Sequence, residues 1–156
     1  MAPWPAADAE QLAGSACPLC AEGRPDQIGS RWRFSASPSS DAYLHGHGVQ
    51  RGYVVLIWRG RHVVDPTELS AWEAQAFWES AMRVSRAMRQ VYQPLKTNYQ
   101  LLGNRMAHLH GILAPRFIDD IAAGDPLPGS GYQAVLEAQV ASELAQLRAA
   151  LTKENA

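Results

Sequence analysis

The chain has 156 residues, of which 47% are hydrophobic and 19% charged, with a formal net charge of −1. That length suits one domain with a sizeable core, and the composition excludes a wholly disordered chain. A nearly neutral charge gives no general attraction for nucleic acid, so we expect no nucleic-acid polymer as a partner. No apolar run approaches the ~20 residues of a membrane helix, and the N-terminus lacks the pattern of a secretion signal. We therefore expect a cytoplasmic protein with no membrane partner.

The N-terminal region carries both cysteines of the chain, Cys17 and Cys20. We expect residues 1–16 to be a flexible lead-in and residues 17–27 to form a turn-rich segment, here called the knuckle. A C-x-x-C pair has three interpretations: half of a zinc site, a redox pair, or an accident of packing. Redox use is typical of a strand followed by a helix, whereas this pair lies among loop-forming residues. Half of a zinc site is the favoured interpretation, provided that two further ligands exist elsewhere.

Strands are predicted next along the chain. Alternation of aromatic and charged residues favours a short strand over 31–34, and a second is expected over 42–44. The pair of glycines in His45-Gly46-His47-Gly48 predicts a solvated turn. The segment 51–58 is rich in aromatic and β-branched residues between glycines, which predicts the strongest strand.

One long helix and a second group of elements follow. Ser70 and Glu73 have the spacing of a capping box, apolar residues then recur at helical spacing, and Pro94 ends the helix by Tyr92 or Gln93. Aromatic residues of this helix, Trp72, Phe77 and Trp78, are expected mainly in packing. Strands are predicted over 96–102 and 109–115, then a loop over 118–131 and an amphipathic helix over 135–151. This order predicts an α+β fold with a mostly antiparallel sheet.

The most informative stretch is His108-Leu109-His110, because it places two histidines two residues apart in an apolar run. On a strand, alternate side chains share one face, so both imidazoles are expected to project together. Imidazoles in such a position serve as metal ligands, nucleophiles or general bases.

The segment from Asn98 to His110 resembles the signature of the histidine-triad (HIT) superfamily, which reads His-φ-His-φ-His after a Gly-Asn or Gly-Gln pair. The strand Gly52 to Ile57 with Arg61-His62-Val63 after it, the Thr67-Glu68-Leu69-Ser70 before the long helix, and the early C-x-x-C agree with this resemblance. It spans roughly residues 17–120. It implies a single HIT-like domain over residues 17–156, and pairing into a homodimer, with part of the cluster of Trp72, Phe77 and Trp78 as a candidate dimer face.

The resemblance implies nucleotidyl chemistry. Family members cleave or transfer nucleoside monophosphates from conjugates such as dinucleoside polyphosphates and nucleoside phosphoramidates. The middle histidine attacks the α-phosphorus, and a covalent nucleotidyl-imidazole forms before water or another acceptor releases it. With His108 in the first position, His110 is the nucleophile; a register that starts at Met106 would instead make it His108. We prefer the first register, and we expect Asn98, Asn104 and Arg105 to contact phosphate and ribose.

In the preferred register Ile112 occupies the place of the third histidine. Isoleucine has no hydrogen-bond donor, and the loss of one well-placed donor costs ~100–1,000-fold in rate at comparable sites. The expected function is a nucleotidyl hydrolase or transferase. The alternatives are a degenerate HIT protein that binds nucleotide without turnover, and a HIT scaffold recruited to other chemistry. Arg105 is a candidate to replace the lost donor.

The resemblance also implies a metal site. In some branches of the family the first histidine of the motif joins early cysteines and the histidine that follows the central strand. Carried over to this chain, that gives Cys17, Cys20, His62 and His108 as ligands of a structural Zn²⁺. The alternative is that the thiols are free and that the two histidines play local structural roles.

Overall fold

The computed structural model describes residues 9–48, 50–128 and 133–153. Its centre is a six-stranded, wholly antiparallel sheet with strand order β1-β2-β3-β5-β7-β6. The strands of this sheet are β1 (Gln27–Ile28), β2 (Arg31–Ala36), β3 (Ser40–His45), β5 (Val54–Trp58), β6 (Lys96–Gln100) and β7 (His110–Arg116). A small second sheet pairs β4 (His47–Gly48) with β8 (Gln133–Ala134). The predicted α+β class with an antiparallel sheet is confirmed.

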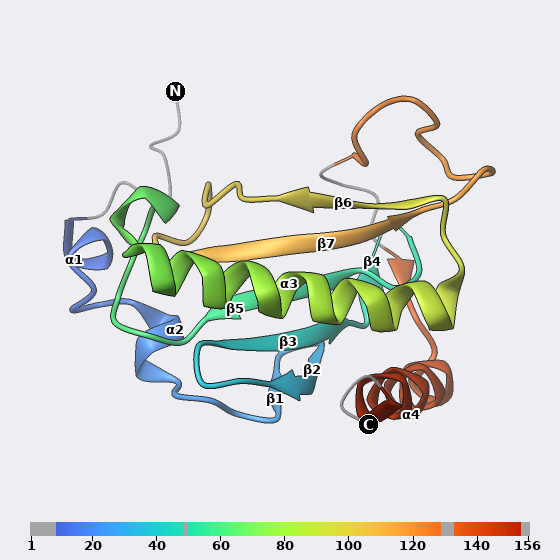
Figure 1. The fold of residues 1–156 in the computed structure, drawn as a ribbon, viewed down its shortest axis with the longest axis horizontal. Coiled ribbons are helices and arrows are strands. Elements are labelled where there is room, and N and C mark those ends of the chain that lie inside the picture. The colour runs from blue at the N-terminus through green and yellow to red at the C-terminus, as the bar shows by residue number, and fades with distance from the viewer. Residues whose placement is uncertain (1–8, 49, 129–132, 154–156) are drawn as a thin grey trace.

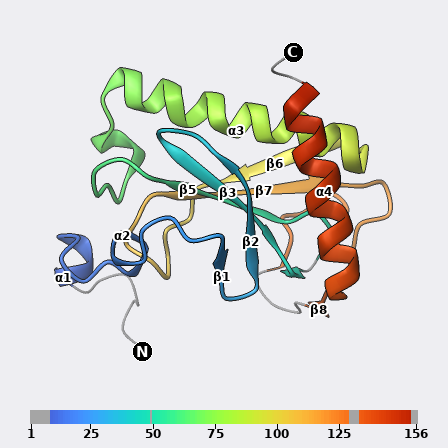
Figure 2. The ribbon, with the colours of Figure 1, turned by 90° about the horizontal axis from the view of Figure 1, so that it is seen from below.

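The helices lie on both sides of the sheet. They are α1 (Ala9–Leu12), α2 (Pro18–Ala21), α3 (Ala71–Tyr92) and α4 (Glu137–Lys153), with a 3₁₀ turn, η2 (Pro66–Glu68), before α3. Figure 1 shows α3 running along the strands, and Figure 2 shows α1 and α2 on the opposite side of the sheet from α3. None of the helices in the described part of the chain combines the length and hydropathy needed to traverse a bilayer.

The long helix begins and ends where its sequence signals predict. Ser70 is the N-cap: its hydroxyl accepts a hydrogen bond from the backbone of Glu73, and the Glu73 carboxylate accepts one from the backbone of Ser70. This reciprocal pair satisfies two backbone donors that the first turn leaves free. At the other end Gln93 adopts the left-handed conformation, with φ of 50°, directly before Pro94. The predicted helix is therefore confirmed at both ends.

The sheet has two unlike faces. The first face packs against α3 and α4 in a large apolar core that includes Leu56, Met88 and Leu147. The second face carries a smaller cluster, in which Val55 and Ile57 of β5 pack near the knuckle. Antiparallel partners share a face, so the pairs Val55–Ile112 and Ile57–His110 place Ile112 and His110 on the second face as well.

Two local predictions are corrected, and a third stays open. His45 to Gly48 is not a free turn: His45 ends β3, and His47 and Gly48 form β4, because β8 supplies hydrogen-bonding partners from a distant part of the chain. Trp72 and Trp78 are 70% and 49% exposed, so of the three aromatic residues expected in packing only Phe77 is buried. The lead-in contains α1 over residues 9–12; its residues 1–8 lie outside the described part, and the domain boundary at 17 stays a prediction.

The placement of His108 in a strand is also wrong, because β7 begins at His110. The backbone before β7 leaves the strand ladder because only one of the two Leu109 hydrogen bonds stays with β5. Leu109 accepts from the amide of Trp58, the last residue of β5, and donates to the carbonyl of Val63 beyond the turn. His108 is thereby directed toward the knuckle, and only His110 takes its direction from the strand.

Candidate functional site

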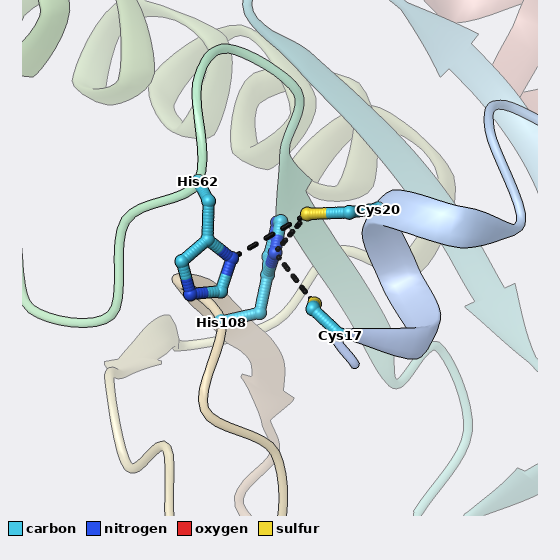
Figure 3. Close-up of side chains that lie close together, drawn as sticks. All are labelled: Cys17, Cys20, His62 and His108. Atoms are coloured by element: carbon cyan, nitrogen blue, oxygen red, sulfur yellow. Dashed lines mark hydrogen bonds between the residues drawn. The ribbon is translucent and has the colours of Figure 1, made fainter. Parts of the chain in front are cut away.

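Four side chains that could hold a metal ion converge between the knuckle and the sheet (Figure 3). Cys17 is the N-cap of α2 and Cys20 lies within α2, His62 follows β5, and His108 precedes β7. The Nδ1 atom of His108 lies 3.3 Å from Sγ of Cys17 and 3.5 Å from Sγ of Cys20. The Nδ1 atom of His62 lies 3.4 Å from Sγ of Cys20. One donor atom from each of the four residues lies within 4.8 Å of the others, so the predicted ligand set is brought together.

The spacing of these atoms matches tetrahedral coordination. With metal–sulfur bonds of about 2.3 Å and metal–nitrogen bonds of about 2.0 Å, tetrahedral angles separate sulfur and nitrogen by about 3.5 Å. The other ring nitrogens are engaged: Nε2 of His108 donates to the carbonyl of Trp58 at 2.8 Å, and Nε2 of His62 donates to that of Leu12 at 3.2 Å. These bonds leave both Nδ1 lone pairs facing the sulfurs, as metal-ligating histidines require. The residues present therefore fit a metal ion.

Burial sets the protonation of this cluster in the absence of a cation. Burial, followed by the hydrogen bond and charge of Cys17, raises the pKa of the Cys20 thiol to about 11. Burial also lowers the pKa of His108, which favours the neutral ring. A neutral imidazole is the form that binds metal, whereas the thiols must lose protons when a cation arrives.

His110 occupies different surroundings, two residues away. Its Nδ1 donates to the carbonyl of His108 at 2.7 Å, and no described residue forms a hydrogen bond with its Nε2. His110 lines a pocket of about 330 Å³, together with His108 and with Leu101, Leu102 and Gly103 of the loop before β7. Burial lowers the pKa of His110, so its ring is mainly neutral near pH 7. The geometry thus presents an imidazole lone pair at a pocket, which suits a nucleophile or a general base.

The predicted substrate contacts fall in two places. Asn98 is half-buried on β6 opposite Ala114, which places it on the same sheet face as His110. Asn104 and Arg105 are exposed in the loop between β6 and β7. The structure gives none of the three a contact with His110, so their roles in substrate binding stay predictions. Ile112 also lies on this face, opposite Gln100 of β6.

Arg31 belongs to none of the sequence motifs described above. This residue begins β2 opposite His45, and its Nε is buried without a hydrogen-bond partner in the described chain. After burial, which is the larger cause, its positive charge helps lower the pKa of His45 to about 4 and also lowers that of His110. The alternation of Arg31 with Trp32 indicates that the two side chains lie on opposite faces of the strand. Only the folded sheet shows that the charge of Arg31 acts on His110.

Comparisons with known proteins agree with this geometry. A family model described as "HIT domain" matches residues 34–117, which is more than half of the chain. The comparison with curated proteins found no match. The fold resembles the crystal structure of a histidine triad protein from Bradyrhizobium japonicum, with a TM-score of 0.72 and 22% identity over 78% of this chain and 91% of that one.

Two further solved structures share the fold. A histidine triad protein from Marinobacter aquaeolei is 24% identical over 80% of this chain and 90% of that one, with a TM-score of 0.71. A Zn-bound histidine triad family protein from Mycobacterium smegmatis is 20% identical over 90% of this chain and 96% of that one, with a TM-score of 0.66. The family match, which extends through the two histidines of the motif, shows that the chain belongs to the HIT domain family.

Proposed function

We propose that this protein is a nucleotidyl hydrolase or transferase that acts on nucleoside phosphate conjugates such as dinucleoside polyphosphates or nucleoside phosphoramidates. The observation that carries the proposal is the state of His110. Its Nδ1 is committed to the carbonyl of His108, its ring is neutral, no described residue forms a hydrogen bond with its Nε2, and the residue lines a pocket beside His108. A HIT domain with such an imidazole is suited to covalent catalysis.

In the proposed reaction the lone pair of His110 Nε2 attacks the α-phosphorus. A phosphorus–nitrogen bond forms while the bond from phosphorus to the leaving oxygen or nitrogen breaks, and the leaving group takes up a proton. Water or another acceptor then attacks the same phosphorus and breaks the bond to nitrogen, which returns the free imidazole. The bond from Nδ1 to the His108 carbonyl stabilises the positive charge that the ring carries in the intermediate.

Ile112 makes this a slow or altered member of the family. We propose that Ile112 stands at the third motif position, where relatives supply a donor to phosphate or leaving group. Its side chain offers none. We further propose Asn98, Asn104 and Arg105 as substrate contacts. Arg31 joins them, because its buried Nε lacks a partner and guanidinium groups bind phosphate strongly.

We propose that the Cys17, Cys20, His62 and His108 cluster holds Zn²⁺. Two thiolates and two imidazoles at tetrahedral spacing suit this ion, and a Zn-bound histidine triad protein shares the fold. With all four positions taken by protein, the ion would supply a crosslink between the knuckle and the sheet. In this account His108 is a structural ligand, and His110 is the residue that meets substrate.

We also propose a homodimer that pairs through α3 and the outer strand β6. Trp78 and Tyr99 are 49% and 43% exposed, and their rings meet edge to face at 5.5 Å. Trp72, on the same helix, is 70% exposed. Exposed aromatic groups beside a sheet edge are typical of an interface between protein chains. Sedimentation velocity of the purified protein tests this, and a monomer at micromolar concentration would contradict it.

The second candidate is a HIT protein that binds nucleotide without turnover, or whose scaffold serves other chemistry. Ile112 is the observation that favours it, because the site then lacks a donor that phosphoryl transfer uses. The two candidates predict different products: the enzyme releases nucleoside monophosphate, whereas the second binds nucleotide in calorimetry and releases none.

The test is to trap the intermediate. The protein is mixed with a nucleoside phosphoramidate and, separately, with a dinucleoside polyphosphate, then quenched in base, which preserves bonds between phosphorus and histidine. We expect a nucleotidyl group on wild type and none on His110→Ala. His47→Ala, which removes a histidine of β4, is the matched control and should retain the adduct. Adduct on His110→Ala, or turnover without adduct on wild type, would refute the proposal.

A further inference from the structure

A buried carboxylate lies beneath the knuckle. Asp41 of β3 has a fully buried side chain, and its Oδ2 accepts from Nε of Arg59 at 2.9 Å. Arg24 of the knuckle donates to the same carboxylate at 2.5 and 3.0 Å. Arg33 of β2 lies farther away, at 3.7 Å. A carboxylate removed from water is costly unless charged donors surround it, so this arrangement is a built feature of the fold.

Arg59 extends this network to the backbone between the two cysteines. Its side chain is 4% exposed, and its three nitrogens have three different partners. Nε donates to Asp41, Nη1 donates to the carbonyl of Leu19 at 2.9 Å, and Nη2 donates to the hydroxyl of Tyr43 at 3.1 Å. Leu19 lies between Cys17 and Cys20, so one guanidinium ties the centre of the C-x-x-C turn to the sheet.

Tyr43 adds a second point of attachment. Its hydroxyl accepts from Arg59 and donates to the carbonyl of Pro25 at 2.9 Å, at the far end of the knuckle. Together Asp41, Tyr43 and Arg59 hold the knuckle at Leu19, at Arg24 and at Pro25. Neither Asp41 nor Arg59 belongs to the group of four metal donors. This network can act on a metal ion through the backbone that carries the thiols, and also through the charge of Arg59, which reaches Cys20 and His108.

We propose that Arg59, oriented by Asp41, is a positioning residue for metal binding: it fixes the Leu19 carbonyl and thereby presents Cys17 and Cys20 at coordination spacing before the cation arrives. This inference rests on the metal site proposed above and is independent of catalysis by His110. Residues that orient metal ligands typically contribute 10–100-fold to affinity. A buried ion pair that only stabilised the fold would leave affinity unchanged.

The experiment compares the same substitution at two arginines that face one carboxylate. Arg59→Lys keeps a positive charge near Asp41 but has no fork to reach Leu19 and Tyr43 at once. Arg33→Lys changes a group near Asp41 that pairs with Asp26 at the far end of the knuckle, whereas Arg59 bonds to the turn between the two cysteines. Metal-free protein is titrated with Co²⁺, whose absorption reports thiolate ligands and coordination geometry. Zn²⁺ affinity then follows by competition, and the melting temperature of each metal-free variant is measured alongside.

We expect Arg59→Lys to bind Co²⁺ and Zn²⁺ about 10–100-fold more weakly with an altered absorption band, whereas Arg33→Lys stays within about 2-fold of wild type. Tyr43→Phe, which keeps the ring and removes two hydrogen bonds, should weaken binding by about 2–10-fold and serves if Arg59→Lys does not fold. Wild-type affinity in Arg59→Lys, or in Tyr43→Phe if that variant has to serve, would overturn the inference alone. A wild-type protein that binds no Co²⁺ would overturn the metal site and the inference with it.

Discussion

His108 and His110 are two residues apart, yet the fold commits them differently. Both ring nitrogens of His108 are engaged, Nε2 by the Trp58 carbonyl and Nδ1 by the cysteine thiols. His110 has only Nδ1 engaged among the described residues, by the His108 carbonyl, although both histidines line the same pocket. The difference arises because β7 begins between them. An imidazole with both nitrogens engaged suits a structural role, whereas one with a nitrogen left over suits catalysis. One short motif can therefore supply a structural and a catalytic residue.

The largest effect on turnover is expected when a histidine is restored at the third motif position. Ile112→His places an imidazole on the same face as His110, and we expect turnover of a nucleoside phosphoramidate to rise ~100–1,000-fold, the usual effect of one well-placed donor. Steady-state release of nucleoside monophosphate measures this. Ile112→Val is the control and should leave the rate unchanged. A folded Ile112→His protein with wild-type turnover would contradict the assignment of His110 to the middle position.

Removal of one thiol tests whether His108 and its neighbours hold a structural metal ion. Cys17→Ser should lose the cation and destabilise the fold by on the order of 3 kcal/mol. This is less than the ~10–16 kcal/mol that zinc contributes to small zinc fingers, because a hydrophobic core remains here. Urea unfolding with one equivalent of Zn²⁺ measures the loss. The variant should unfold with the midpoint of chelator-treated wild type; equal stability of wild type and variant in Zn²⁺ would count against the site.

Some parts of the candidate site could be predicted from the sequence, and others could not. The short motifs around Cys17, His62 and His108 predicted which side chains cluster, because each motif carries its residue to a fixed point of a known fold. The strand assigned to His108 was wrong, because the carbonyl of Val63 bonds to Leu109 and no local pattern reports that contact. The network of Asp41 and Arg59 was missed for the same reason: its members come from separate strands and meet only when the sheet forms.

Elements with local signals were easier to predict than those without. The capped helix α3 was predicted at both ends, since its caps are encoded by adjacent residues. The strand β4 was not, since its partner β8 lies more than eighty residues away. The helical spacing of Trp72 did not decide between packing and a dimer face, because an aromatic residue at that spacing is compatible with either a core or an interface.

Substitution of Arg31 tests whether its positive charge contributes to substrate binding near His110. Arg31→Gln removes the charge that lies near His110 on the second face, and we expect kcat/KM to fall by about 10–100-fold, since charge-assisted bonds contribute ~1.5–3 kcal/mol. Arg33→Gln is the control, because Arg33 is already paired with Asp26. The outcome that would exclude Arg31 from substrate binding is an equal, small effect of both substitutions.

The smallest expected effect concerns acid stability. Burial, with help from Arg31 and His47, lowers the pKa of His45 to about 4. The unfolded chain binds this proton at higher pH than the folded chain, so stability is lost as the pH falls below about 6.5 toward 4. We expect wild type to lose about 1 kcal/mol more than His45→Gln between pH 7.5 and pH 5, a value reduced for solvent screening. Urea unfolding at both pH values measures the difference, and parallel losses would contradict the shift.

The central claim is that His108 binds a structural metal ion and His110 meets the substrate. The most direct test is anomalous diffraction at the zinc edge, on a crystal grown with Zn²⁺ and soaked with a nucleoside monophosphate. We predict a metal peak bonded to Cys17, Cys20, His62 and His108, with phosphorus close to Nε2 of His110. A metal bonded to His110, or phosphate bound at His108, would contradict the account.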